Sequence, residues 1–440
     1  MRGIPSNQRP IPETLPRLRG KRVAMVMYSF YPIDPRPRRA IGALLNEGMT
    51  VDLICLNRDN APTTETLGGV NILRLPIKRR RDSKVVYVWN YFAFILITAA
   101  ILAWRSIKRR YDLVYINNMP DILVFASFVP KTLGAKVVLD LHDPMPELLT
   151  TIFNLDGDSL GVRLIRWLEK SSIEFSHFVL TTNSAFKRVF ASRSCSPEKI
   201  GIVMNSPDEQ IFPCRKPRSY NFEKAVPEKR FVIMYHGSMV ERNGVDLAVA
   251  ALAQVVKAVP AAELRIFGLE TPFLAKVLDW ARKQGLEDSV HFLGLRNLED
   301  LVTEIADCDV GVIPNHRNSF TDINMPTRIF EYLTMGKPAI SPRTTGIRDY
   351  FPEDSMIFFE PGDAQDLARK LEHVAFHYSE ALDKAERGQS IYLAHTWSRE
   401  RRMLTNSVDK LLNGKQLPLI STSHFHRESD SYVTSQPPGE

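Results

Sequence analysis

The chain has 440 residues, 44% of them hydrophobic and 24% charged, which indicates a globular protein too long for one ordinary core. Its net charge of +7 is modest for this length, and two domains are expected. Cys55, Cys195, Cys214 and Cys308 have neither CxxC nor Cys/His spacing, which argues for a reducing compartment and against structural zinc. Residues 1–20 lack an apolar core, so we expect a flexible arm rather than a signal peptide.

Strand-like apolar runs alternate with helical patterns through the first half of the chain, which predicts a parallel sheet with crossover helices. We assign this domain to residues 21–208, with helices over residues 38–47 and 122–133. The expected strands cover residues 23–28, 51–56, 71–75, 113–116, 136–141, 178–181 and 202–204.

An apolar run at residues 85–104, "VVYVWNYFAFILITAAILAW", has the ~20 residues needed to cross a bilayer. Three interpretations compete: a spanning helix, a buried core helix and a helix lying on a membrane surface. Strands that flank the run and join one sheet must lie on the same side of any membrane. Positive charge at both ends of the run also lacks the one-sided bias that orients a spanning helix. Both observations argue against the spanning helix. We prefer peripheral attachment to an anionic membrane surface, because the flanks are basic. The basic residues are Lys78, Arg79, Arg80, Arg81, Lys84, Arg105, Lys108, Arg109 and Arg110.

Residues 209–230 interrupt the pattern with prolines and charges and are expected to form a linker. The alternation restarts in residues 231–380, which predicts a second domain of the same class. Residues 381–412 are expected to be helices that return toward the first domain, and the polar tail at 413–440 to be disordered. The predicted fold is α/β, with two doubly wound parallel sheets whose strand ends face a ligand-binding cleft.

Two segments of the second domain could carry chemistry. In "NMPTRIFEYLTMGKPAI" (residues 324–340) a short helix starts at Pro326 and stops at Gly336. Its apolar residues fall on one face, the inner stripe, and Glu331 lies beside that face. A solvated surface charge is the plain interpretation of Glu331. In "YHGSMVERNG" (residues 235–244) a strand enters a glycine-containing turn whose amides can face a phosphate, with Arg242 as a cationic partner. Alone, this turn is a weak motif.

These segments stand in a fixed order with "RIFG", "HFLGLRNLEDL" and "ADCDVGVIP". The ordered set resembles the family 4 glycosyltransferases, retaining enzymes of the two-Rossmann-domain glycosyltransferase B fold. The resemblance spans about residues 22–412 and is strongest over residues 235–366. It implies transfer of a sugar from a UDP- or GDP-sugar to an acceptor, with no cofactor and no metal ion.

The resemblance also implies roles for the donor domain. Glu331 would accept hydrogen bonds from ribose hydroxyls, the helix start would aim amides at the diphosphate, and Arg242 and Arg328 would neutralise the leaving group. The expected donor-binding residues are Gly237, Ser238, Arg242, Asn243, Met325, Thr327, Arg328 and Glu331.

Two positions depart from the family pattern. Ile323 stands where many members have a second Glu that contacts the donor sugar, so its neighbours Asp322 and Asn324 become the candidates for that contact. Asn243 stands where a Lys is common, which moves the cationic role to Arg242.

The first domain is expected to supply the acceptor side. His142 and Asp143 directly follow a strand and, with Arg242, are the candidate catalytic residues; a structural histidine is the alternative interpretation. By resemblance, His142 would lie near the reacting carbon of the sugar. The loop "YSFYPIDPRPRRA" is expected to be stiff and basic and to bind an anionic acceptor. The acceptor-side candidates are Asp34, Arg36, Asn118 and Glu147.

These expectations describe a cytoplasmic enzyme, peripheral on the inner face of the plasma membrane, that acts on a lipid-linked or saccharide acceptor in bacterial surface polysaccharide assembly. No nucleic acid partner is expected. Two alternatives remain: a nucleotide-sugar 2-epimerase of the same fold, and a non-catalytic membrane-associated scaffold, which Ile323 and Asn243 favour.

Overall fold

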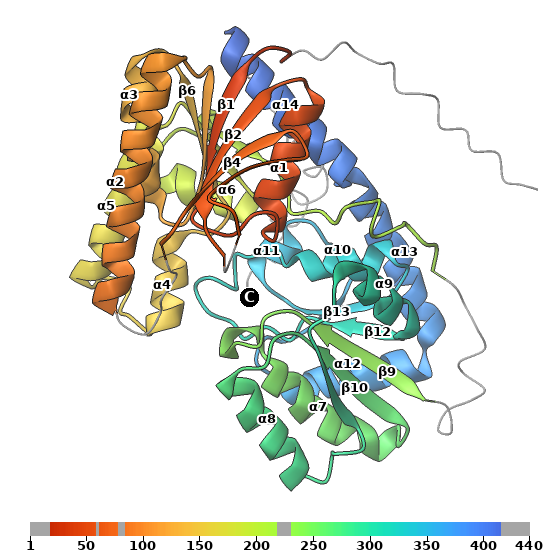
Figure 1. The fold of residues 1–440 in the computed structure, drawn as a ribbon. Helices are drawn as coiled ribbons and strands as arrows, with labels where there is room; N and C mark the ends of the chain where they lie inside the picture. The colour runs from red at the N-terminus through yellow and green to blue at the C-terminus, as the bar shows by residue number, and fades with distance from the viewer. Residues whose placement is uncertain (1–17, 59–60, 78–83, 218–229, 415–440) are drawn as a thin grey trace, which may run out of the picture.

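The computed structural model describes residues 18–58, 61–77, 84–217 and 230–414. Most of the expected arm, the basic residues 78–83, the middle of the expected linker and nearly all of the expected tail lie outside the described residues. Two α/β domains, each built on its own sheet, face one another, and two long helices run along one side of the pair (Figure 1). The predicted fold class is therefore confirmed.

The first sheet has eight strands in the order β3-β4-β2-β1-β5-β6-β7-β8. All neighbours are parallel except β3, which pairs antiparallel with β4. The strand β3 was not predicted, because it is a short polar edge strand with no apolar run to reveal it. The strands are β1 (Arg22–Val26), β2 (Thr50–Leu56), β3 (Thr64–Leu67), β4 (Val70–Leu75), β5 (Leu113–Asn117), β6 (Lys136–Leu141), β7 (Phe178–Thr181) and β8 (Ile200–Ile202).

Alternating side chains of these strands form two hydrophobic cores, one on each face of the sheet. The helices α1 and α14 supply the core on one face, and α2, η1 and α6 contribute buried residues to the core on the other. The helices are α1 (Pro35–Asn46), α2 (Lys84–Lys108), η1 (Asp121–Ser127), α3 (Phe128–Thr132), α4 (Met145–Phe153), α5 (Leu160–Phe175), α6 (Ser184–Arg193), η2 (Pro197–Lys199) and α14 (Trp397–Asn413).

Two helix predictions in this domain need correction. The helix α1 begins at Pro35, three residues earlier than expected, so Arg36 lies in its first turn and not in a stiff loop. Proline is tolerated at the first helical position because its missing N–H would be unpaired there anyway. The expected helix over residues 122–133 is a 3₁₀ helix, η1, followed by the short α3.

The second sheet has six parallel strands in the order β11-β10-β9-β12-β13-β14. Buried residues of α7, α8 and α12 pack on one face and those of α9 and α10 on the other, while α13 contributes to both cores. The strands are β9 (Phe231–His236), β10 (Ala262–Phe267), β11 (Val290–Gly294), β12 (Val310–Val312), β13 (Ala339–Pro342) and β14 (Ile357–Phe359). The helices are η3 (Glu241–Asn243), α7 (Val245–Ala258), α8 (Pro272–Lys283), α9 (Leu298–Asp307), α10 (Thr327–Thr334), α11 (Thr345–Arg348), α12 (Ala364–Phe376) and α13 (Tyr378–Ala394).

The apolar helix α2 packs on the first sheet with one side only. Phe94 and Leu102 are buried in the core, whereas Trp89, Leu96 and Ile107 are 68–74% exposed. By length and composition α2 could cross a membrane, and 22% of the apolar window is buried within the protein. The strands that flank it, β4 and β5, belong to the same sheet, so in this fold α2 is a surface helix of the domain rather than a separate span.

The chain passes from the first domain to the second after β8, which we call the first crossing, and it passes back after α13, which we call the second crossing. The Ser206 hydroxyl donates to the carbonyl of His395, and Glu209 accepts hydrogen bonds from the amide and the hydroxyl of Ser398 at 2.9 and 2.7 Å. The first and second crossings are thus tied together. Beyond them α14 lies against α1 of the first domain (Figure 1).

Candidate functional site

A cavity of about 430 Å³ opens between the two domains, at the carboxyl ends of the strands. Both domains and the first crossing contribute to it, which is the position expected for a ligand in doubly wound folds. Its lining residues are Asp34, Pro35, Arg36, Arg38, Arg39, His142, Asp143, Thr182, Asn205, Pro207, Asp208, Ile211, Phe212, Leu298, Asn324, Met325, Pro326, Thr327 and Glu331.

The helix α10 brings Glu331 to the cavity. Its inner stripe, which includes Ile329, Phe330 and Leu333, is buried against the second sheet, so the helix is fixed in rotation. Glu331 lies beside that stripe with its side chain 14% exposed. One carboxylate oxygen, Oε2, lies 2.6 Å from Nε2 of His236 at the end of β9. Glu331 is therefore not the solvated surface charge of the plain interpretation.

The glycine turn after β9 is held by neighbouring polar groups. Arg328 donates from its guanidinium to the carbonyl of His236 at 2.9 Å and to Asn315 Oδ1 at 2.9 Å. The Asn243 amide donates to the carbonyl of Ser238 at 2.9 Å. These contacts fix the backbone of the turn, and they show Asn243 and Arg328 engaged with the protein itself.

Gly244, between η3 and α7, can only be glycine. Its φ is +69°, and a Cβ there would lie 1.8 Å from the carbonyl oxygen of Pro314. Gly237 has a φ of +135°, and a Cβ there would meet the guanidinium of Arg328 at 3.0 Å. Gly244 lets the backbone at Pro314 approach closely, and Gly237 leaves room for the guanidinium of Arg328.

Arg242 follows the glycine turn and has a free guanidinium among the residues that the structure describes. Its side chain makes no hydrogen bond or ion pair with the residues that the structure describes. Burial lowers the pKa of its guanidinium, and the carboxylate of Asp143 in the other domain opposes that change. Arg242 and Asp143 are thus close enough across the cleft to interact electrostatically.

The first domain presents His142 and Asp143 directly after β6. The backbone amide of His142 donates to Asn118 Oδ1 at 3.1 Å, and the Asn118 amide donates to the carbonyl of Asp143 at 3.0 Å. Asn118 also donates to Asp121 Oδ1 at 3.1 Å. Nδ1 of His142 is buried without a partner among the described residues. Asn118 therefore positions the backbone that carries the two candidate catalytic residues, rather than lining the cavity itself.

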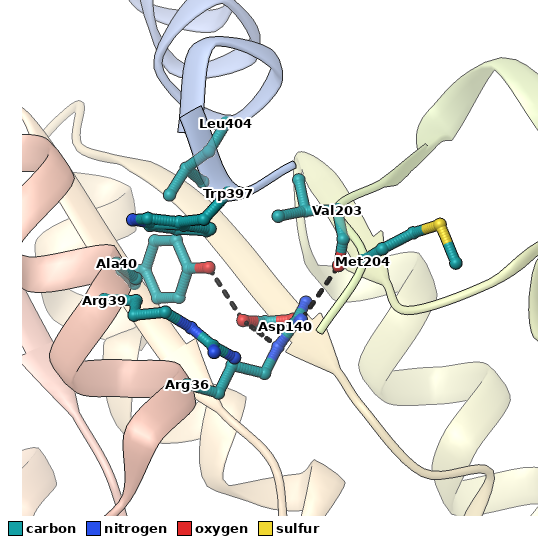
Figure 2. A pocket seen from close by; sticks show the side chains of 9 residues that line it. Arg36, Arg39, Ala40, Asp140, Val203, Met204, Trp397 and Leu404 are labelled. Atoms are coloured by element: carbon teal, nitrogen blue, oxygen red, sulfur yellow. Dashed lines mark hydrogen bonds and ion pairs between the residues drawn. The ribbon is translucent and has the colours of Figure 1, made fainter. Parts of the chain in front are cut away.

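Arg36 lines the cavity but is committed to a buried ion pair. Its guanidinium contacts the carboxylate of Asp140 at 2.6–3.1 Å and donates to the carbonyl of Val203 at 2.9 Å (Figure 2). Figure 2 also shows Arg39 beside this pair, under Trp397 of α14; its guanidinium lies 5.4 Å from the centre of the Trp397 ring. Burial, and then the charge of Arg36, lower the pKa of Arg39 to about 10. Both arginines thus hold the first domain to the crossing and to α14.

Two of the predicted site residues, Glu147 and Asp322, form ion pairs with arginines of the protein instead of lining the cavity. Glu147 does not line the cavity, because both of its oxygens accept from Arg193 at 2.6 and 3.0 Å. Asp322 accepts from Arg317 at 2.8 Å and from Thr345 at 2.9 Å, so both of its oxygens are occupied. Its neighbour Asn324 does line the cavity.

Several lining residues were not singled out from the sequence. Arg38 and Arg39 lie within the loop motif without an assigned role, and Leu298 lies within a predicted helical pattern. His236 was overlooked, although its place at the carboxyl end of β9, directly before Gly237, was a usable signal. In the described residues, no group of three or more His, Cys, Asp or Glu side chains is arranged to hold a metal ion.

Comparison with known families accounts for most of the chain. Residues 33–206 match the glycosyl transferase 4-like domain, and residues 218–386 match the family described as glycosyl transferases group 1. A curated relative, the D-inositol 3-phosphate glycosyltransferase of Corynebacterium kroppenstedtii, is 24% identical over 52% of this chain and 52% of its own length. The chain spans about half to two thirds of the length of the curated relatives that it matches.

Solved structures share the fold at low sequence identity. Sucrose-phosphate synthase from Thermosynechococcus elongatus superposes with a TM-score of 0.71 at 17% identity, over 90% of this chain and all of the other. Anabaena HepE in complex with UDP and glucose has a TM-score of 0.66 at 14% identity, over 89% of this chain and all of the other. At these identities the similarity concerns the fold.

Proposed function

This chain belongs to the group 1 glycosyl transferases, with a family 4-like first domain, and from that premise we propose that it transfers a sugar from a UDP- or GDP-sugar to an acceptor with retention of configuration. The observation that carries the proposal is the cavity between the domains. Glu331 and the start of α10 line it from one side, and His142 and Asp143 from the other. HepE, which shares the fold, is described in complex with UDP and glucose.

The donor would lie along the second domain. Glu331 would accept from the ribose hydroxyls, and the turn at Gly237 together with Arg242 would meet the diphosphate. In the reaction the bond from the anomeric carbon to the β-phosphate oxygen breaks, and the nucleoside diphosphate leaves with the electron pair. A bond to the acceptor oxygen forms, and the acceptor proton passes to the departing phosphate or to His142. Arg242 is the cation placed to stabilise the charge of the leaving group.

A thermal-shift panel of UDP-, GDP- and ADP-sugars, followed by transfer assays, tests this proposal. A ligand at a hundred times its Kd should stabilise the protein by about 2.7 kcal/mol. We expect one base to be selected and Glu331→Ala to abolish most of the shift. No shift with any donor, and no turnover with lipid extracts as acceptor source, would refute the enzyme proposal and favour the scaffold alternative. Epimerised free nucleotide sugar would identify the epimerase instead.

We further infer that the acceptor is lipid-linked, because the first domain presents a large apolar surface. Of the 23 large hydrophobic side chains that are exposed in the described residues, 16 lie between residues 86 and 167. They belong to α2, η1, α3, α4, α5 and the loop before α5. In space α2 contacts η1 and α3, η1 contacts α5, and α5 contacts α4. Soluble monomers rarely expose contiguous apolar surface on this scale. We name this set of helices the apolar layer.

Charge and aromatic content favour a lipid bilayer as the occupant of the apolar layer. Trp89, Trp104 and Trp167 are 57–70% exposed, and tryptophan is enriched where protein meets the membrane interface. Lys108 lies 3.8 Å from the centre of the Trp104 ring. Exposed cations at the end of α2 and along α5 suit anionic headgroups: Lys108, Arg109, Arg110, Arg163 and Lys170. The protein would act at the cytoplasmic face of the plasma membrane, in surface polysaccharide assembly.

Vesicle flotation tests the membrane proposal. The full chain should float with vesicles containing anionic phosphatidylglycerol and be released by replacing Trp104 and Trp167 with Ser. A matched control is Trp280→Ser, since Trp280 is 40% exposed on α8 of the other domain. If the double variant floats with the vesicles as fully as the Trp280→Ser control does, the proposal is contradicted.

A further inference from the structure

His236 and Glu331 form the shortest polar contact at the donor side of the cavity. His236 ends the central strand β9 and is 5% exposed, and Glu331 reaches it from α10. Nε2 of His236 lies 2.6 Å from Oε2 of Glu331, and Nδ1 lies 2.9 Å from the hydroxyl of Tyr332. The Tyr332 hydroxyl in turn lies 2.9 Å from the carbonyl oxygen of Met234. Four groups thus form one hydrogen-bonded chain.

The direction of this chain follows from its buried end. A carbonyl can only accept, so the Tyr332 hydroxyl donates its proton to Met234. Burial raises the pKa of Tyr332 well above its ordinary value, so that proton stays in place. The Tyr332 oxygen must then accept from Nδ1–H of His236. With Nδ1 protonated, the 2.6 Å contact between Nε2 and Oε2 needs a second proton between the two atoms.

The pair therefore has no net charge: it is either an imidazolium with a carboxylate or an imidazole with a carboxylic acid. The other oxygen, Oε1, accepts no hydrogen bond from the described residues and belongs to a side chain that lines the cavity. One oxygen of Glu331 is thus held by the protein, while the other is open to a ligand.

Resting on the nucleotide-sugar function proposed above, we propose that His236 is the positioning residue for ribose recognition. It fixes Oε2 of Glu331, aims Oε1 at the ribose hydroxyls, and removes the net negative charge that Glu331 would otherwise present to a nucleoside diphosphate. An uncompensated carboxylate would repel the diphosphate of the donor, whereas a neutral pair does not. The Tyr332 hydroxyl acts through the histidine, by keeping the ring in one orientation.

The test compares UDP, or GDP if the donor panel selects it, with the 2′,3′-dideoxy form of the same nucleotide, by calorimetry on the full chain. The wild type should bind the dideoxy form at least tenfold more weakly. His236→Phe keeps a ring but loses both contacts, so it should bind the normal nucleotide about tenfold more weakly and discriminate the two forms by less than threefold. Tyr332→Phe should lie between the wild type and His236→Phe.

Two controls separate a positioning role from general damage. His291→Phe changes a histidine on β11 of the same sheet, outside the cavity lining, and should keep the full tenfold discrimination. In a double-mutant cycle, adding Glu331→Gln to His236→Phe should weaken binding little further, because both changes remove the same contact.

The outcomes are distinguishable. If His236→Phe discriminates the ribose hydroxyls as the wild type does, or if its effect adds fully to that of Glu331→Gln, the positioning role is overturned while the proposed function stands. If the wild type binds no nucleotide at all, the proposed function fails and this inference with it. If His236→Phe fails to fold, Tyr332→Phe decides: undiminished discrimination by that variant also overturns the role.

Discussion

The two walls of the cavity differ in how their charged side chains are used. In the first domain, Arg36 is bonded to Asp140, and Glu147, which does not line the cavity, is bonded to Arg193. In the second domain, Glu331 lines the cavity and keeps one oxygen open, and Arg242, outside the lining, has no side-chain partner among the described residues. Side chains that are fully paired within the protein hold the fold, and those with open bonding capacity are placed to bind a ligand. Changes at Arg36 and Glu147 should therefore alter stability, and changes at Arg242 and Glu331 should alter binding or transfer.

The largest effect should come from Arg36→Ala. This change leaves Asp140, whose side chain is 1% exposed, as a buried carboxylate that keeps one side-chain hydrogen bond within the described residues, from the hydroxyl of Tyr115. Breaking a buried pair by removing one partner costs about 3–5 kcal/mol, so thermal unfolding should start at a much lower temperature. A variant as stable as the wild type would show that the pair on the first wall is not structural, and the contrast between the walls would fail.

Arg242→Ala tests the opposite wall. Because the side chain has no partner to lose among the described residues, the free energy of unfolding should change by less than about 0.5 kcal/mol. The transfer rate should fall about 10²–10³-fold, since a cation at the leaving group is removed. Arg282→Ala is the matched control, as Arg282 lies 67% exposed on α8 of the same domain. Equal transfer rates for the two variants would contradict the role of Arg242.

Glu147→Gln sharpens the comparison near the first wall. Arg193 would keep its contacts with the buried Glu169 at 2.8 Å and lose a charge-assisted partner. We expect a loss of about 1.5 kcal/mol in stability and a transfer rate within twofold of the wild type. A strong loss of transfer without a loss of stability would instead return Glu147 to the acceptor side.

The last effect concerns pH. Burial, and next the charge of Glu169, raise the pKa of Asp121 to about 8. An unfolded Asp has a pKa near 3.9, so between about pH 4 and pH 8 the folded state holds a proton that the unfolded state has released. Stability contributed by Asp121 is therefore lost as the pH rises through this window.

Asp121→Asn should remove this pH dependence. Relative to the wild type, the variant should gain at least about 2 °C in Tm between pH 5.5 and pH 9. The exposed Asp158→Asn should show no such trend. A constant difference between Asp121→Asn and the wild type across this range would mean that the carboxyl titrates as an ordinary Asp.

The sequence predicts the two sheets well, because buried parallel strands are continuous apolar runs that stand out between helical patterns. It also places Glu331, His142 and Asp143 at strand ends or in a helix beside the cleft. It does not predict side-chain partners, since Arg36 and Asp140 are 104 residues apart and His236 and Glu331 are 95 apart. The sequence also does not show which elements cover an apolar helix, so it could not predict whether the outer side of α2 is exposed. The helix α7 is also apolar but is covered by α8 and α12, whereas the outer side of α2 is exposed.

The helix α14, the last in the described part of the chain, has a consequence for how this protein is made. Its Leu404 and Val408 complete the core on one face of the first sheet, and Glu400 accepts from the amide of Met204 at 2.8 Å. We therefore expect that face of the first sheet to stay uncovered during translation until the second domain and α14 have been synthesised. A fragment that ends near residue 208 should be prone to aggregation, and supplying α14 as a separate peptide should rescue its solubility.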